Sequence, residues 1–305
     1  MPAVRSASSI SIVVPVYNGA ATIADTLGGL LAQTGIDGRD VEFIVVDNNS
    51  TDETPEIVRS FPVTFLQEKK SGAGAARNCG LGHARGDIIM YLDADTLPTR
   101  RWLAHLAGVF DDANVMIAVG NTLVFQPETA EERYCAAAGL NYSQRAIERR
   151  PFPFAPSLNM AVRRGAALAI GGWAEDMPTA EDVDFSLRLL RAYPGEIAYA
   201  RDAVLFHKNR NDRSALLRQA WTYGQGAADM YLRYPDIARW DFRKSCTLAA
   251  ILGIRGVAPS FLRAARVLRL ATPEQVEFAT YHRFWTFWYW RGFFSMLRHR
   301  VRLAP

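Results

Sequence analysis

The segment SIVVPV, residues 11–16, is a short apolar run rich in β-branched side chains, the first of four such runs in the N-terminal third of the chain. The others are VEFIVVD (41–47), VTFLQ (63–67) and GDIIMYLD (86–93). Segments in which apolar residues recur at helical spacing separate these runs. Strands that alternate with helices in this way predict an α/β protein with a parallel, doubly wound sheet.

Polar clusters follow three of the predicted strands. The first strand runs into PVYNG (15–19), the second into VDNNSTD (46–52), and the fourth into Asp93 and Asp95. Because ligands of open α/β sheets lie beyond the carboxyl ends of the strands, these clusters predict one shared binding crevice. Taken alone, either of the first two segments is also a good strand exit or helix N-cap sequence.

Asp93 and Asp95 stand one residue apart, so in an extended strand both side chains project to the same side, roughly 7 Å apart. Two carboxylates this close repel each other unless a cation or a catalytic task compensates. The DAD string alone leaves three interpretations open. They are a solvated turn, a metal site for a nucleotide-sugar, and the nucleophile of a haloacid-dehalogenase-type phosphatase.

The phosphatase interpretation also requires a lysine between the aspartates and a later acidic pair. After Asp95 the only lysines of the chain are Lys208 and Lys244, and neither precedes the acidic pair Glu181–Asp182. The order of residues therefore weighs against this chemistry.

Composition describes an ordinary globular protein, with 305 residues, 49% hydrophobic and 22% charged. Cys79, Cys135 and Cys246 lack the spacing of a disulfide framework or a zinc site, which indicates a reducing compartment. No GxGxxG or P-loop motif is present. The most apolar stretch near the C-terminus is divided by Arg255, so no membrane span is expected and the protein is expected to be cytoplasmic.

Two further features of the second half point to a polar site. The segment GGWAEDMPTAEDVDFSLRLLRAY (171–193) has a glycine turn, then Glu181–Asp182, then an amphipathic helix. Such a pair can also merely complement the helix dipole. His207 lies just past an apolar, strand-like run, where a neutral imidazole could complete a metal site with Asp95.

Seven motifs follow one another along the chain: SIVVPVYNGAATIADTLGGLLAQT, FIVVDNNSTDET, GAARNCGL, GDIIMYLDAD, NMAVRR, GGWAEDMPTAEDVDFSLRL and FHKNR. In this order they resemble the glycosyltransferases of family 2, which have a GT-A nucleotide-binding fold, from residue 10 to about residue 235. The resemblance implies a GT-A-type doubly wound mixed sheet flanked by helices, with a catalytic domain over residues 1–210. A helical, basic and aromatic extension would occupy residues 211–305. One departure is Asn48, where the family usually has an aspartate, and the QxxRW motif of processive synthases is not found.

The resemblance implies an inverting, metal-dependent transfer of a sugar from a nucleoside diphosphate, with a UDP-sugar favoured, to a hydroxyl of a lipid-linked or cell-envelope glycan. Asp95 and His207, with Asp93 nearby, would hold Mn²⁺ or Mg²⁺. Asp182 would be the general base, and Glu181 would be an orienting or acceptor-binding group. A catalytically inactive binding module of the same fold is the alternative. Residues expected to bind the donor are Pro15, Tyr17, Asp47, Asn48, Arg77 and Asp93.

The C-terminal segment is basic and aromatic. From residue 241 onward there are 11 Lys/Arg and 3 Asp/Glu, a net charge of +8, against −4 for residues 1–240. Nine of the fourteen residues 281–294 are aromatic. Tryptophan and tyrosine beside arginine are typical of the bilayer interface, which predicts a peripheral protein whose residues from about 270 onward lie on the inner leaflet of the cell membrane. The alternative is a helix packed by its aromatic side; nothing in the catalytic segment favours a nucleic-acid partner.

Overall fold

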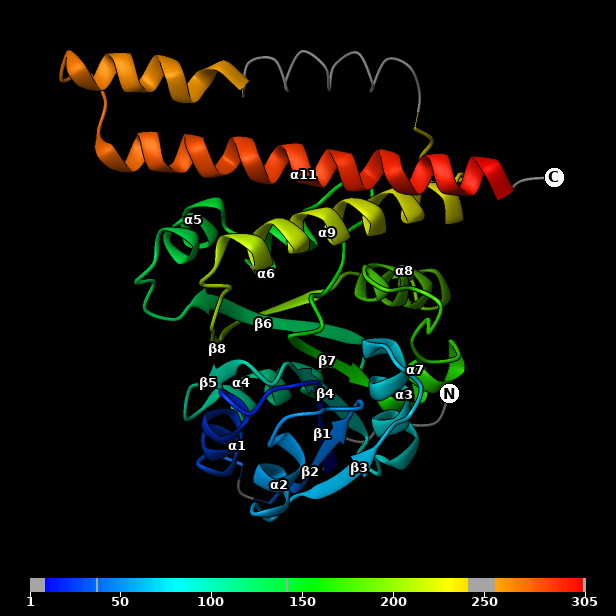
Figure 1. Ribbon diagram of the computed structural model, residues 1–305. Helices are drawn as coiled ribbons and strands as arrows, with labels where there is room; N and C mark the ends of the chain where they lie inside the picture. Colours follow the sequence, from blue (N-terminus) through cyan, green and yellow to red (C-terminus); the bar gives the residue numbers. More distant parts are fainter. Residues whose placement is uncertain (1–8, 37, 141, 241–255, 304–305) are drawn as a thin grey trace. The chain divides into compact units, whose positions relative to one another are not determined.

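A computed structural model describes residues 9–36, 38–140, 142–240 and 256–303 (Figure 1). The chain forms two compact units. One comprises residues 1–125 and 141–208, and the other comprises residues 126–140 and 209–305. The first unit contains the sheet, and the described elements of the second are helices.

The sheet of the first unit has eight strands in the order β3-β2-β1-β4-β7-β6-β8-β5. Its N-terminal half, β3-β2-β1-β4, is parallel, which confirms the pattern predicted from the alternating strands and helices. The sheet is mixed because β7 runs antiparallel to β4 and β6, and β5 runs antiparallel to β8. The strands are β1 (Ser9–Val16), β2 (Asp40–Asp47), β3 (Thr64–Gln67), β4 (Ile88–Leu92), β5 (Thr96–Pro98), β6 (Ile117–Val124), β7 (Asn159–Arg163) and β8 (Ala198–His207).

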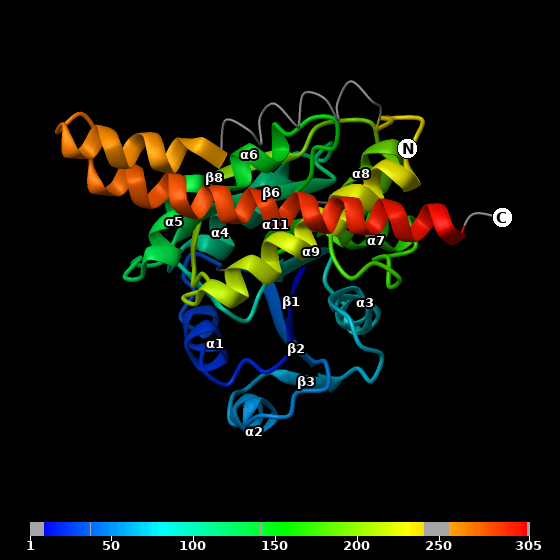
Figure 2. The ribbon, with the colours of Figure 1, turned by 45° about the horizontal axis from the view of Figure 1, so that its top comes forward.

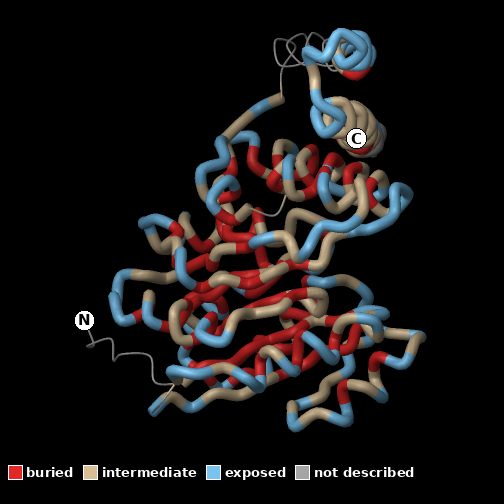
Figure 3. The backbone as a smooth tube through the Cα atoms, turned by 90° about the vertical axis from the view of Figure 1, so that its left-hand side faces the viewer, coloured by how far each residue is buried: buried red, intermediate tan, exposed pale blue. Residues whose placement is uncertain are grey.

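Helices cover both faces of this sheet, as a doubly wound fold requires. Alternate side chains of β1 face opposite layers: Ile12 and Val14 join the core under α1, α2 and α4, while Val13 joins the core under α3, α7 and α8. Figure 2 shows α1 and α3 on opposite sides of β1, and Figure 3 shows the central strands as buried. The helical segments of this unit are α1 (Ile23–Leu31), α2 (Thr54–Arg59), α3 (Ala73–His83), α4 (Trp102–Gly108), η1 (Val109–Asp111), α6 (Ser143–Ile147), α7 (Arg164–Ala169) and α8 (Glu181–Ala192).

The second unit contains α5 (Ala130–Ala138), α9 (Arg213–Arg233), a helix over residues 256–267 and α11 (Pro273–Leu303). The backbones of α9 and α11 lie very close together at Gly224. Glycine has no Cβ atom, and one added here would overlap the carbonyl oxygen of Tyr289. Aromatic side chains of the two helices meet along this contact, as with Trp221 and Trp288, whose ring centroids are 6.0 Å apart. Most aromatic residues of α11 are thus used for packing inside their own unit, although Phe287 is 55% exposed.

None of the described helices is both long enough and apolar enough to cross a membrane.

Candidate functional site

The first part of the site lies at the carboxyl ends of β1 and β2. Pro15 is half-buried on β1, and the ring of Tyr17, just past the strand, is 62% exposed. Asp47 ends β2 and is buried, with its Oδ1 accepting a hydrogen bond of 3.3 Å from the backbone N–H of Ser50. The Ser50 hydroxyl in turn accepts a bond of 2.9 Å from the N–H of Asn18. These bonds fix the two strand exits against each other and leave Tyr17 facing solvent.

Asn48 ties a neighbouring loop to the end of β2. Its Nδ2 donates to the carbonyl oxygens of Glu68 (2.9 Å) and Lys70 (2.8 Å), and its Oδ1 accepts from the N–H of Gly72 (2.8 Å). A carboxylate has no N–H and could not make the first two bonds. The amide at this position therefore has a positioning role, and a direct contact between Asn48 and a nucleotide base stays a prediction.

Glu175 holds the far end of the same loop, a contact that no local pattern predicts. Its Oε2 lies 2.6 Å from Nζ of Lys70, and its Oε1 accepts a bond of 2.6 Å from Nδ2 of Asn78. The loop that carries Lys70 is thereby connected to the glycine turn before α8. The ammonium group of Lys70 is engaged in this ion pair.

The turn that carries Asp93 and Asp95 is built between β4 and β5. The hydroxyl of Thr26, from α1, donates a bond of 2.8 Å to the carbonyl oxygen of Thr96, which begins β5. In the β5–β8 pair Thr96 is opposite His207, so the sheet register sets the imidazole beside the turn. As a result Nε2 of His207 lies 3.4 Å from Oδ1 of Asp95.

Asp95 and His207 fit two positions of a divalent metal site. Atoms 3.4 Å apart can both reach one cation at ligand distances of about 2.0–2.2 Å. Within the described ranges no group of three or more His, Cys, Asp or Glu side chains is arranged to hold a metal. Asp95 and His207 would supply two ligands, and phosphate oxygens and water would complete the shell, a pattern common for Mg²⁺-type sites.

Arg77, on α3, is the buried cation of the site. Its guanidinium lies 2.8 Å from Oε1 of Glu181 and 3.3 Å from Oδ1 of Asp93, which are far apart in the sequence. Loss of water around Asp93 raises the pKa of that carboxyl, and Arg77 opposes the shift without cancelling it. Arg77 thus joins the turn after β4 to the start of α8.

The indole ring of Trp173 packs against the guanidinium of Arg77. The guanidinium carbon of Arg77 lies 4.9 Å from the centre of the indole ring, and the ring of Phe185 stacks on Trp173 at 4.3 Å. Only 3% of Trp173 is exposed. These surroundings indicate that Trp173 packs in the core rather than stacking on a sugar ring.

Asp182 lies in the first turn of α8, directly after Glu181. Ala180, the last residue before α8, has a left-handed φ of 63°, which turns the chain sharply into the helix. The carboxyl accepts bonds from the N–H groups of Val183 (2.9 Å) and Ser157 (3.5 Å). Loss of water and the neighbouring Glu181 nevertheless raise the pKa of Asp182 to about 7. A carboxyl with this pKa is suited to accept a proton near neutral pH.

The structure therefore joins predicted residues from four separate segments into one cluster. Asp93, Asp95 and His207 interact electrostatically with one another, and Arg77 interacts with Asp93 and with the acidic pair of α8. The strand exits of β1 and β2 form the other part of the same sheet edge, since β1 lies between β2 and β4. Residues of the cluster are Arg77, Asp93, Asp95, Glu181, Asp182 and His207; residues of the strand exits are Pro15, Tyr17, Asp47 and Asn48.

Comparison with known proteins identifies the family and the fold. The family described as Glycosyl transferase family 2 matches residues 11–171. The glycosyltransferase AglE of Haloferax volcanii is 27% identical over 73% of this chain and 74% of its own length. The pre-mycofactocin glycosyltransferase of Mycobacterium tuberculosis is 31% identical over 77% of this chain, which spans about half (50%) of that relative. A similar fold is found in a mannosyltransferase of Pyrobaculum calidifontis, solved with GDP-Man and Mn²⁺ (TM-score 0.58, 19% identity, 97% of this chain and 76% of that one).

Proposed function

The chain belongs to glycosyl transferase family 2, and we propose that it moves one sugar from a nucleoside-diphosphate sugar to an acceptor hydroxyl, with inversion and with the help of a divalent metal. This proposal rests on one observation: the cluster contains a pair of side chains suited to bind a metal and a different side chain suited to accept a proton. The Asp95–His207 pair is suited to a cation, while Asp182 has a pKa of about 7 and is suited to take a proton.

The donor half of the proposed reaction involves the ends of β1, β2 and β4. Tyr17 and Asp47, with Pro15 and the loop held by Asn48, would receive the base and ribose, and Asp93 would lie near the ribose. Mn²⁺ or Mg²⁺ held by Asp95 and His207 would stabilise the charge on the departing diphosphate. A UDP-sugar is the proposed donor. Solved proteins with this fold have been bound to GDP-Man or to UDP-GlcNAc, so the fold alone does not fix the base.

The acceptor half involves the start of α8. Asp182 would remove the proton of the acceptor hydroxyl as its oxygen attacks the anomeric carbon from the face opposite the diphosphate. Displacement in one step inverts the configuration at that carbon. Glu181, held by Arg77 at 2.8 Å, would keep the helix start in place and orient the acceptor.

We further propose that the acceptor is a lipid-linked or cell-envelope glycan and that the protein works in the cytoplasm, peripherally at the inner face of the cell membrane. Support for this part comes from the second unit alone, where basic residues are concentrated. The active transferase and the inactive binding module, which share one fold, are separated by the experiment below.

Two variants of the full chain test the division of roles. UDP binding in the presence of Mn²⁺, followed by calorimetry, should be lost in Asp95→Ala and nearly unchanged in Asp182→Asn, because only the former removes a metal ligand. UDP release from UDP-sugars mixed with membrane extract should disappear in both. Asp202→Asn, an exposed carboxylate on β8, is the matched control and should behave like the unmodified protein in both assays.

Equal loss of UDP affinity in Asp95→Ala and Asp182→Asn would contradict the assignment of Asp182 as a base. If the unmodified protein released no UDP or GDP from any common donor with either metal, the inactive module would be the better description.

A further inference from the structure

The side chain of Asn78, on α3, forms three hydrogen bonds with one short segment that precedes α8. Its Nδ2 donates to the carbonyl oxygen of Trp173 (3.0 Å) and to Oε1 of Glu175 (2.6 Å), and its Oδ1 accepts from the N–H of Trp173 (2.8 Å). Both donor hydrogens and the acceptor oxygen of the amide are therefore in use. An aspartate of the same shape has no N–H and could make only the last of these bonds.

The backbone before α8 lies directly against this amide. Gly172 has a left-handed φ of 70°, and a Cβ atom at this position would overlap Oδ1 of Asn78. The turn can approach Asn78 this closely only because residue 172 has no side chain. The bonds of Asn78 thus hold the turn in one conformation.

The other end of the same loop is held by the residue before Asn78. Arg77 binds Glu181 at 2.8 Å, and Glu181 begins α8. Two consecutive residues of α3 therefore hold both ends of the loop over residues 174–180. This loop leads directly into Asp182.

The first turn of α8 depends on contacts of this kind because it has no side-chain cap. Ala180 stands at the N-cap position and has no side-chain oxygen that could accept a bond from the first N–H groups of the helix. Trp173 adds a second connection, since its ring stacks on Phe185 of α8 at 4.3 Å and lies 4.9 Å from the guanidinium carbon of Arg77. By fixing the backbone of Trp173, Asn78 also fixes the ring that supports α8 and Arg77.

We propose that Asn78 is a positioning residue for the transfer step, which holds the first turn of α8 so that the carboxyl of Asp182 meets the acceptor hydroxyl. The inference rests on the proposed function for the role of Asp182. The hold of Asn78 on residues 173–183 is measured without sugar transfer, so the two can fail separately. All three bonds of the amide go to the turn before α8, and donor binding should therefore depend on it only weakly.

Asn78→Asp in the full chain tests this role. The change removes two bonds and places a second carboxylate beside that of Glu175, so the turn should move away. Hydrogen exchange, followed by mass spectrometry, should become faster in residues 173–183. The rate of UDP release from saturating UDP-GlcNAc or UDP-glucose with membrane extract should fall about 10- to 100-fold, because a misplaced reacting group is costly. UDP affinity in the presence of Mn²⁺, from calorimetry, should stay within about threefold.

A second change at Glu175 should repair the first. Glu175→Gln gives this position an amide that can donate to the carboxylate introduced by Asn78→Asp, so the bond between the two side chains is restored in the opposite direction. The double variant should regain roughly fivefold or more of the lost release rate, and the exchange of residues 173–183 should slow again. A general loss of stability would not be repaired in this way.

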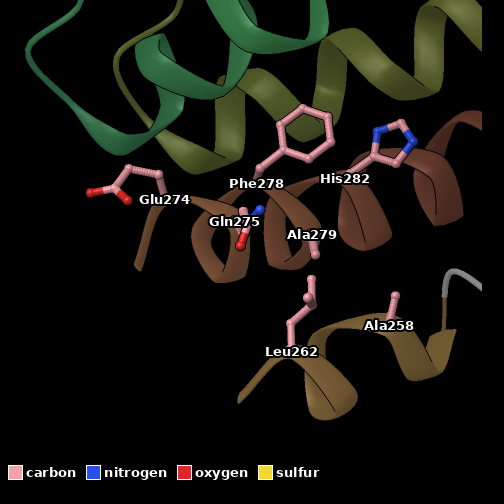
Figure 4. Close-up of a pocket in the computed structure, with 7 residues that line it drawn as sticks. All are labelled: Ala258, Leu262, Glu274, Gln275, Phe278, Ala279 and His282. Atoms are coloured by element: carbon pink, nitrogen blue, oxygen red, sulfur yellow. The ribbon is translucent and has the colours of Figure 1, made fainter. Parts of the chain in front are cut away.

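Two controls separate positioning from stability. Gln33 also makes three bonds through its amide, to Gly29, Thr99 and Leu103, all of 2.9 Å. Gln33→Glu is therefore the same chemical change outside the site, and it should lower the melting temperature without altering UDP release or the exchange of residues 173–183. Leu262→Ala removes packing in the second unit, where Leu262 points toward α11 across an open pocket of about 520 Å³ (Figure 4), and it should also leave that exchange unchanged.

Three results would overturn the proposal. They are unchanged exchange of residues 173–183 in Asn78→Asp, an equal fall of the release rate in Gln33→Glu, and a loss of UDP affinity as large as the loss of rate. If the unmodified protein releases no UDP from either donor, the proposed function fails, while the exchange comparison still decides whether Asn78 holds the start of α8.

Discussion

Replacing Asp182 by asparagine should stabilise the protein at alkaline pH while abolishing transfer. In the folded state the pKa of Asp182 is raised from 3.8 to about 7, so the folded protein retains a proton that the unfolded chain releases near pH 4. The free energy of unfolding therefore falls as the pH rises through this window. A difference of about three pH units at about 1.4 kcal/mol each sets an upper limit of about 4 kcal/mol.

Asparagine does not ionise, and its one amide oxygen can still accept the 2.9 Å bond from the N–H of Val183. The N–H of Ser157 donates to the other carboxyl oxygen at 3.5 Å, and that long bond would be lost. The variant should therefore exceed the unmodified protein by roughly 2–4 kcal/mol at pH 8, and the two should converge below pH 4. Urea unfolding at several pH values between 4 and 8 measures this difference. Asp202→Asn, on the exposed surface of β8, should show no such divergence.

The same carboxyl should determine how transfer depends on pH. A general base acts in its ionised form, so kcat/KM should rise as the pH approaches 7 and level off above it, following the pKa of about 7. The reasoning would be refuted if Asp182→Asn were less stable than the unmodified protein at pH 8. It would also be refuted if the variant retained transfer with the same pH profile.

Two further changes test the parts of the site that hold the donor. His207→Ala should weaken Mn²⁺ binding about 10- to 100-fold in a metal titration while the melting temperature stays within a few degrees, and a large loss of melting temperature with unchanged metal affinity would indicate a packing role instead. Asn48→Asp removes the donors to the carbonyl oxygens of Glu68 and Lys70, so it should lower stability by about 1–3 kcal/mol and raise KM for the donor. An unchanged melting temperature with unchanged KM would show that those two bonds do not hold the loop.

The parallel half of the sheet and the acidic end of its fourth strand in the chain could be predicted from short-range patterns. The parallel half of the sheet follows from apolar runs that alternate with helical spacing, and Asp93 and Asp95 are recognisable because they end such a run. The pairing of Asp95 with His207 depends on the antiparallel β5–β8 register, which no local pattern specifies. The order of polar segments indicated that these residues belong together, but only the sheet connections bring them within 3.4 Å.

Other features have no local signal at all. Glu175 and Ser157 act through single contacts with residues far away in the sequence, and the type of residue does not identify such contacts. Residues 126–140 leave the sheet and pack with the helices of the second unit, because α5 meets α11 through Tyr134 and Tyr281. The aromatic segment of α11 was ambiguous for a related reason. Tryptophan and tyrosine suit both a bilayer interface and a helix contact, and only the close approach of α9 separates the two.

The position of Arg77 favours the proposal that Asp182, rather than Glu181, acts as the base. Three carboxyls meet near one buried guanidinium, which cannot balance all of them equally. Arg77 contacts Glu181 at 2.8 Å and Asp93 at 3.3 Å, whereas Asp182 forms no ion pair within the described part of the chain. A carboxylate held in an ion pair is a weak base, since giving it a proton would abolish the pair. The carboxyl without such a partner keeps its affinity for a proton, and it lies on the first turn of α8, where an acceptor hydroxyl would have to be activated.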